Sequence, residues 1–201
     1  MLRSISLLIL MTLISASCSH NRVSSLKDPT HQDKKYQRVL VIGNFASNKV
    51  IKEVENQFSR NLNKSGVFAL PNYQLLPPLR EYSEEEIKTA LDKDNFDALI
   101  VVTPIANDVT NIHLSQDKSE ADPISIIKKS STRLNTSIDS KIPSKVNTQI
   151  MLYDLDKGFA VWKGHTPAYI NETTIYDNLT AIISSIIERM QYDGMIAANT
   201  E

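Results

Sequence analysis

The chain has 201 residues, and its 22 basic and 23 acidic side chains give a formal net charge of −1. This balance argues against a nucleic-acid partner, which needs a basic surface, and against a highly charged disordered chain. The single cysteine excludes an internal disulfide, so a hydrophobic core must hold the fold, and the chain is long enough to form one.

The N-terminus has the pattern of a secretory signal peptide over residues 1–17. Arg3 precedes a short apolar run, ISLLILMTLI, and small residues follow it directly before Cys18. The run is shorter than the roughly 20 residues that a membrane-spanning helix needs. A cysteine in this place resembles the bacterial lipobox, in which the cysteine is lipidated and becomes the first residue of the mature protein. Simple secretion with a free Cys18 thiol is the alternative, and Ser15, where lipoboxes usually carry leucine, favours it.

The residues around Cys18 indicate where the protein is located and how far its folded domain can stand from the membrane. A lone cysteine is unusual in a secreted protein, which favours lipidation. Ser19 stands where an aspartate would imply retention in the inner membrane, so the resemblance implies the outer membrane, with the protein facing the periplasm. Residues 18–37 are polar and lack periodicity, and we expect the lipidated cysteine followed by a flexible tether. Residues 38–201 are then expected to form one α/β domain.

The first part of that domain predicts a strand, a helix and a second strand. Residues 38–43 (RVLVIG) are a continuous apolar run, typical of a central strand covered on both faces. Residues 49–64 carry an apolar stripe at every fourth position, including Phe58, which predicts an amphipathic helix. Residues 67–76 predict another strand, and Pro71 within it indicates an edge strand or a break.

The next part completes a β-α-β-α-β pattern. Ser83 and Glu86 are spaced as a capping box, which predicts the start of a helix. Residues 97–103 (DALIVVT) predict a second fully buried strand. Strands that alternate with helices over short connections form parallel sheets with right-handed crossovers.

The last part departs from this pattern. Residues 115–144 are poor in large apolar side chains, and we expect an exposed insert there. Residues 145–155 and 159–169 flank a turn at Gly158 and predict an antiparallel hairpin whose first strand is half-buried. Residues 174–193 carry a strong apolar stripe and predict a C-terminal helix. The expected fold is a βαβαβ parallel half extended by this hairpin and helix, in two or three layers.

No assembled catalytic set is evident. None of the four histidines has the spacing of a zinc pair, so we expect no metal, and no Gly-x-Ser-x-Gly elbow is present. Gly43 follows the first strand but lacks the further glycines of a nucleotide-binding loop, so we expect no cofactor. The protein is therefore expected not to be an enzyme.

Two groups of residues remain as candidates for binding. Open α/β sheets bind ligands at the carboxyl ends of their parallel strands, where four polar residues would gather: Asn44, Ser47, Asn48 and Thr103. Trp162 and Tyr169 in the hairpin would form a partner surface if Trp162 faces outward, and a core position for Trp162 is the alternative.

Four stretches resemble a group of uncharacterised bacterial lipoproteins with a small periplasmic α/β domain: RVLVIG at 38–43, GVFALPNYQLLP at 66–77, DALIVVT at 97–103 and TQIMLYDLDKGFAVWKG at 148–164. More distantly, the layout resembles lipoprotein modules of curli-secretion, peptidoglycan-synthase-activator and exopolysaccharide-export systems. The resemblance implies a membrane-anchored, non-enzymatic component that binds an envelope protein or itself. A periplasmic small-ligand-binding protein or enzyme is the alternative.

Overall fold

The computed structural model describes residues 23–31, 34–45, 47–105, 122–133, 147–166 and 175–197. The expected signal peptide and Cys18 lie outside these ranges. The strands are β1 (Ser24–Lys27), β2 (Arg38–Gly43), β3 (Phe68–Pro71), β4 (Ala98–Ile105), β5 (Asn147–Asp154) and β6 (Phe159–Thr166). The helices are α2 (Asn48–Lys64), α3 (Asn72–Leu75), α4 (Glu84–Lys93), α5 (Pro123–Arg133) and α6 (Ile175–Tyr192).

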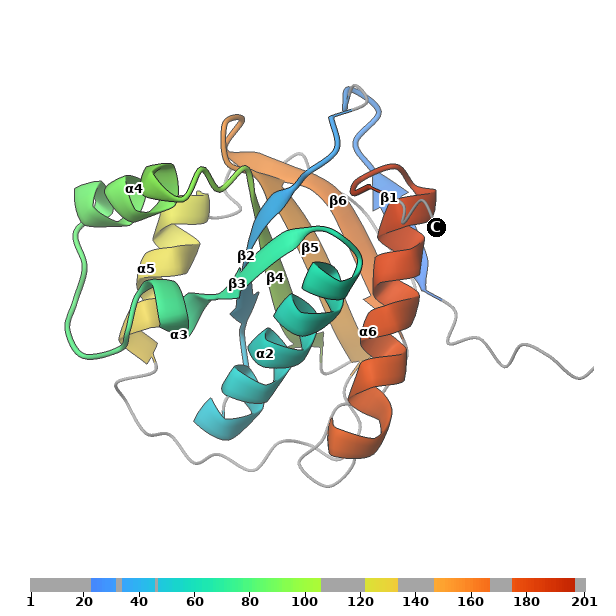
Figure 1. Ribbon diagram of the computed structural model, residues 1–201, viewed down its shortest axis with the longest axis horizontal. Helices are drawn as coiled ribbons and strands as arrows, with labels where there is room; N and C mark the ends of the chain where they lie inside the picture. Colours follow the sequence, from blue (N-terminus) through green and yellow to red (C-terminus); the bar gives the residue numbers. More distant parts are fainter. Residues whose placement is uncertain are drawn as a thin grey trace, which may run out of the picture.

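The strands form one six-stranded sheet in the order β1-β6-β5-β4-β2-β3 (Figure 1). β2 pairs in parallel with β3 and with β4, whereas β4, β5, β6 and β1 pair antiparallel in turn. This arrangement confirms the predicted α/β fold, in which a βαβαβ parallel half is extended by an antiparallel hairpin and followed by a C-terminal helix.

Helices cover both faces of the sheet, so the protein has three layers. Val39 and Val41 of β2 point into a core shared with α2 and α6. Leu40 and Ile42 point the other way, into a second core shared with α3, α4 and α5. Because successive strand residues face opposite sides, a strand buried on both sides must be apolar throughout, as β2 is.

Local sequence signals explain several boundaries. The capping box at α4 forms as predicted: the Ser83 hydroxyl accepts from the Glu86 N–H at 3.2 Å, and the Glu86 carboxylate accepts from the Ser83 N–H at 2.8 Å. Pro71 lies in β3, an edge strand of the sheet, where a missing N–H is tolerated. Gly158 closes the β5–β6 turn with a φ of 75°, a conformation that favours glycine.

The prediction of a flexible tether over residues 18–37 is wrong for much of that segment. β1 pairs with β6, Ser24 opposite His165 and Lys27 opposite Trp162. Tyr36 is fully buried and bridges to Ile196. β1 is short and has one apolar side chain among its four residues, so its strand conformation depends on pairing with β6 and not on a pattern in its own sequence.

The prediction of an exposed insert over residues 115–144 is also wrong in part. α5 lies within this range, and its Ile127 is fully buried in the second core. Residues 106–121 and 134–146 fall outside the described part of the chain. β5 is consequently not half-buried: Ile150 contributes to the first core and Met151 to the second.

Phe58 of α2, which is 1% exposed, tests the core assignment. We predict that Phe58→Ala lowers the free energy of unfolding by about 3–5 kcal/mol, because it removes a buried ring and leaves a cavity. Urea denaturation measures this loss. Leu79→Ala, at a side chain that is 88% exposed, is the control and should change stability by less than about 0.5 kcal/mol. A loss near zero for Phe58→Ala would contradict the packing of α2.

Candidate functional site

The four residues predicted to form a ligand edge lie at one end of the sheet. β2 and β4 end side by side, with Gly43 opposite Val102, and the Asn44 N–H donates to the Val102 carbonyl at 2.8 Å. Thr103 follows Val102 in β4. Ser47 and Asn48 begin α2, and Ser47 is buried at the N-cap, although its side chain makes no capping hydrogen bond. Asn44 and Thr103 therefore lie at neighbouring strand ends, and the binding of a ligand by the four residues stays a prediction.

A buried carboxyl group that the sequence analysis missed lies beside this edge. Glu55 of α2 is 0% exposed. Its Oε1 accepts from the Gly43 N–H at 3.0 Å, and its Oε2 accepts from the Tyr73 N–H at 3.4 Å. The side chain therefore joins the end of β2 to the start of α3. The sequence offered one indication of this role: Glu55 falls on the apolar side of the predicted helix, next to Val54, where a charged side chain is unusual.

The chemistry of Glu55 is that of a structural group. Burial raises its pKa to about 7, against the opposing effect of the backbone N–H donors. A carboxyl group with this pKa exchanges its proton near neutral pH, as a general acid or base does. With no exposed surface, however, Glu55 cannot reach a substrate in this conformation.

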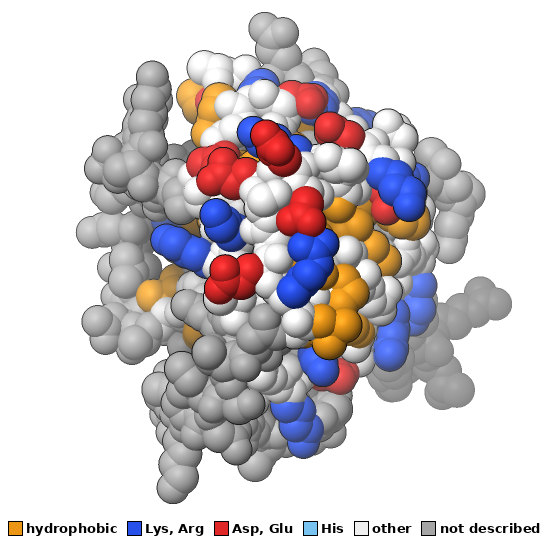
Figure 2. Space-filling model, turned by 90° about the vertical axis from the view of Figure 1, so that its left-hand side faces the viewer, with side chains coloured by type: hydrophobic (Ala, Val, Ile, Leu, Met, Phe, Trp, Pro, Cys, Tyr) orange, Lys and Arg blue, Asp and Glu red, His pale blue; other side chains and the backbone are white. Residues whose placement is uncertain are grey.

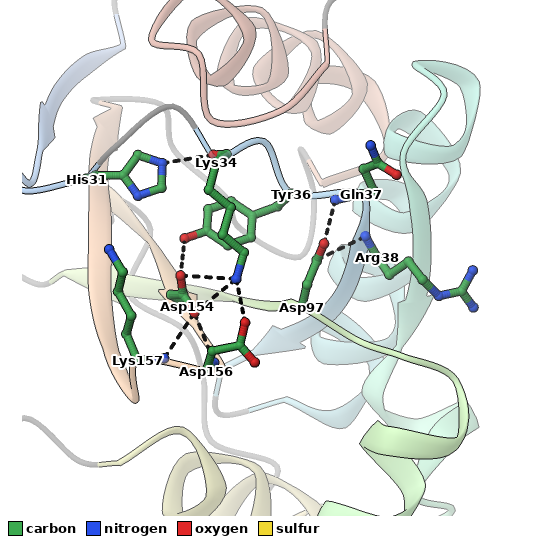
Figure 3. A network of polar contacts seen from close by, with 9 residues as sticks. All are labelled: His31, Lys34, Tyr36, Gln37, Arg38, Asp97, Asp154, Asp156 and Lys157. Atoms are coloured by element: carbon green, nitrogen blue, oxygen red, sulfur yellow. Dashed lines mark hydrogen bonds and ion pairs between the residues drawn. The ribbon is translucent and has the colours of Figure 1, made fainter.

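A second polar network lies at the opposite end of the sheet, around Asp154 at the end of β5 (Figure 3). The Tyr36 hydroxyl donates to Oδ2 of Asp154 at 2.8 Å, and Lys34 Nζ lies 3.3 Å from the same oxygen. Oδ1 accepts the N–H groups of Asp156 and Lys157 at 2.9 and 3.1 Å. The network fixes the segment before β2 onto the β5–β6 turn.

The pKa shifts in this network oppose a catalytic role. Burial and the bond to Asp154 raise the pKa of Tyr36, which disfavours a phenolate. Burial acts to raise the pKa of Asp154, but the Tyr36 hydroxyl, the Lys157 N–H and the Lys34 charge outweigh it and lower that pKa. A hydroxyl that keeps its proton and a carboxylate that stays ionised are suited to holding structure, not to moving protons.

Asp97, directly before β4, also holds the N-terminal segment in place, at the start of β2. Its two carboxylate oxygens accept the N–H groups of Gln37 and Arg38, each at 3.0 Å (Figure 3). Burial raises the pKa of Asp97, and the two N–H donors act against this. The chain entering β2 is therefore held from β4 as well as from the β5–β6 turn.

Trp162 is a core residue, so its prediction as part of a partner surface is wrong. The side chain is 0% exposed, and its Nε1 donates to Asp193 Oδ2 at 2.8 Å. The same carboxylate oxygen accepts from the Ser25 hydroxyl at 2.6 Å and from Arg189 at 3.2 Å. Asp193 thus holds β1, β6 and the end of α6 together. Tyr169 lies outside the described residues.

Two of the four histidines, His31 and His165, lie in the described part of the chain. His31 shares a hydrogen bond with the Lys34 carbonyl at 2.9 Å and stacks on Tyr36. Within the described ranges, no three His, Cys, Asp or Glu side chains gather as a metal site. No helix of the described residues is long and apolar enough to cross a bilayer.

An open surface hollow of about 500 Å³ lies along α4, which we call the α4 groove. Its lining residues are Leu75, Leu76, Arg80, Tyr82, Ser83, Glu85, Glu86, Thr89, Ala90 and Lys93. Unlike the two buried networks, this hollow is accessible to a partner.

Comparison with known proteins gives a distant likeness. No family model and no curated protein matches the sequence. The structure is similar to that of the PelC dodecamer from Paraburkholderia phytofirmans, with 11% identity and a TM-score of 0.41 over 89% of this chain and 99% of that chain. A PelC point variant from the same organism gives 10% identity and a TM-score of 0.39, over 87% of this chain and 98% of that one. Likeness at this level carries no conclusion about function or assembly.

The raised pKa of Glu55 predicts a pH dependence of stability. The folded protein keeps this proton up to a pH of about 7, whereas an unfolded glutamate loses it near 4.5. The stabilisation is therefore full below pH 4.5 and is lost as the pH rises through 7, by about 3 kcal/mol. Chemical denaturation at pH values from 4.5 to 8 should show a larger fall in stability for the wild type than for Glu55→Gln, which does not titrate. Parallel profiles would contradict the assignment.

Proposed function

We propose that this protein is a lipid-anchored lipoprotein of the bacterial cell envelope that acts by contact with another protein and not by catalysis. The observation that carries the proposal is the N-terminal sequence, in which a basic start, a short apolar run and small residues precede a single cysteine, Cys18. Ser19 supports the outer membrane, with the domain in the periplasm.

The position of β1 gives this anchor a short reach. Only six residue steps separate Cys18 from Ser24, the first residue of β1. An extended chain covers at most about 3.5 Å per residue, so the lipid would lie within about 20 Å of the sheet. A tether running to residue 37 would have allowed several times that distance. The domain would therefore work close to the membrane surface.

Three buried or half-buried carboxyl groups of the described residues favour a protein-binding role over a catalytic one. Asp154 and Asp97 hold the N-terminal segment, and Glu55 joins α2 to β2 and α3. Each is occupied by hydrogen bonds from the protein itself. The α4 groove, in contrast, is open to solvent and is lined by both apolar and charged side chains.

Acylation of Cys18 tests the anchor. We predict that wild-type protein incorporates a fatty-acid analogue fed to growing cells and fractionates with membranes, because a multiply acylated cysteine binds a bilayer stably. Cys18→Ala should take up no label and should appear in the soluble fraction or accumulate unprocessed. Ser19→Ala keeps the cysteine and should still be labelled. A wild-type protein without label would overturn the proposal.

A further inference from the structure

The sheet has two edge strands, β3 and β1, and the edge of β3 is closed to further pairing. The Phe68 N–H donates to the Gln37 carbonyl at 2.9 Å, on the β2 side, so Ala69 and Pro71 turn their main-chain groups outward. The Asn63 side chain bonds both groups of Ala69: it accepts the N–H and donates to the carbonyl, each at 2.9 Å. Pro71 has no N–H to offer. A further strand would have to displace Asn63 to pair with β3.

The outer edge of β1 is open within the described residues. The Asp28 N–H donates to the Val161 carbonyl at 2.9 Å, which makes these two residues a hydrogen-bonded pair. Because such pairs alternate along an antiparallel ladder, Leu26 also bonds to β6, whereas Ser25 and Lys27 turn their N–H and carbonyl groups away from it. In the described part of the chain, no strand pairs with this side of β1 and these groups have no partner.

Contacts with the end of α6 hold the open edge of β1 in one position. The Ser25 hydroxyl donates to the Asp193 carboxylate at 2.6 Å and accepts from Arg189 Nε at 2.7 Å. Lys27 Nζ donates to the Asp193 main-chain carbonyl at 3.2 Å. Since β6 pairs with its inner side, β1 is already extended. The binding of a further strand therefore costs little free energy in ordering β1.

An apolar side chain flanks this edge on each face of the sheet. Ser25 and Lys27 point toward α6, so Leu26 between them points to the opposite face, where it is 37% exposed. On the α6 face, Tyr192 is 82% exposed, and the centre of its ring lies 5.1 Å from the guanidinium of Arg189, which contacts Ser25. A strand added beside β1 therefore meets one apolar side chain on each face.

The chemistry of this edge selects an extended polypeptide as its occupant. Unpaired N–H and carbonyl groups in a row bind the same groups of another extended backbone. The side chains of an added strand alternate, so one lies against Leu26 and the next toward Tyr192, which favours consecutive large apolar residues. The opposite side of the molecule, which carries the α4 groove, shows side chains of both charges among apolar ones (Figure 2) and selects no such partner.

A second copy of the chain fits this edge less well than another protein does. A symmetric pair of β1 strands is antiparallel, so the two copies would point the carboxyl ends of their β2 strands in opposite directions. Ser24 lies at that end of the sheet, six residue steps from Cys18, so a lipid could draw that end of only one copy to the membrane. Moreover, a strand of four residues is about 14 Å long. This is short for an interface that must bury about 800 Å² on each partner of a stable dimer.

We propose that β1 binds an extended segment of another protein, which pairs with its open edge and continues the sheet. The segment carries consecutive large apolar residues, which pack against Leu26 on one face and Tyr192 on the other. The inference rests on the proposed function, because it names the surface and the partner chemistry of that contact.

Hydrogen exchange of individual amides in the purified full-length protein tests this directly, with a peptide selected from a displayed random library as the probe. The expected peptide has two or three consecutive large apolar residues. In the free protein, the Ser25 and Lys27 amides should exchange far faster than the Asp28 amide. Saturating peptide should slow Ser25 and Lys27 by about tenfold or more, because their N–H groups then donate to the added strand.

Two variants separate backbone pairing from side-chain contact. Lys27→Pro removes one outward N–H and leaves the bonds of β1 to β6 in place, so it should fold and weaken peptide binding about tenfold or more. Lys27→Ala is the matched control: it keeps the N–H and should bind within about threefold of wild type. Methylation of the peptide nitrogens, one at a time, leaves the protein unaltered. It should weaken binding at alternate positions only, because every second N–H faces β1.

Enrichment of no peptide, or a bound peptide that leaves the exchange of Ser25 and Lys27 unchanged, would overturn the proposal. Equal binding to the two Lys27 variants, with methylation effects that do not alternate, would do the same. Concentration-dependent self-association that protects these amides would also overturn it, since a second copy would then occupy β1. The peptide selection does not depend on Cys18. A labelled, membrane-bound protein that selects no peptide would reject the β1 edge and leave the anchor intact, and an unlabelled protein would reject the anchor alone.

Discussion

The buried carboxylate of Asp154 is the group on which the attachment of the N-terminal segment depends. A fully buried carboxylate needs donors, and here they come from the Tyr36 hydroxyl, Lys34 and two N–H groups of the β5–β6 turn. Leaving such a group short of a donor costs about 1–3 kcal/mol or more. With Tyr36 held there, its N–H reaches the Met195 carbonyl at 2.9 Å, and β1 lies against β6. The segment before β2 is thus part of the domain.

This attachment also sets the orientation that a lipid on Cys18 would impose. Ser24 pairs with His165 near the end of β6, which is the end of the sheet where β2 and β4 also finish. A short linker from Cys18 would turn the edge with Asn44 and Thr103 toward the membrane. The helices α3 and α4 lie on the other side of the molecule from β1 (Figure 1), so the α4 groove would remain open to the periplasm.

The sequence predicted the elements whose patterns are strong and local. β2 and β4 are continuous apolar runs, α2 and α6 carry regular stripes, and the capping box at Ser83 needs only its own residues. β1 was missed because it has only four residues and one apolar side chain, so its conformation is fixed by the strand it pairs with. α5 was missed because it is rich in serine and lysine, and its position is fixed by the core that it packs against. Strict alternation along β6 would place Val161 and Trp162 on opposite faces of the sheet. A register shift in the β5–β6 ladder instead leaves both residues in the same core. Glu55 and Asp154 carry no sequence motif, and their roles follow from the tertiary partners that surround them.

Amide hydrogen exchange in the native protein tests the account most directly, because exchange reports whether residues 23–37 are folded. The N–H groups of Asp28 and Tyr36 donate to Val161 and Met195 at 2.9 Å each. They should exchange far more slowly than in an unstructured peptide, by a factor of about a hundred or more. If both amides exchange at the free-peptide rate while the β2 and β4 amides stay protected, the account is contradicted. Residues 23–37 would then be a flexible tether and not part of the folded domain.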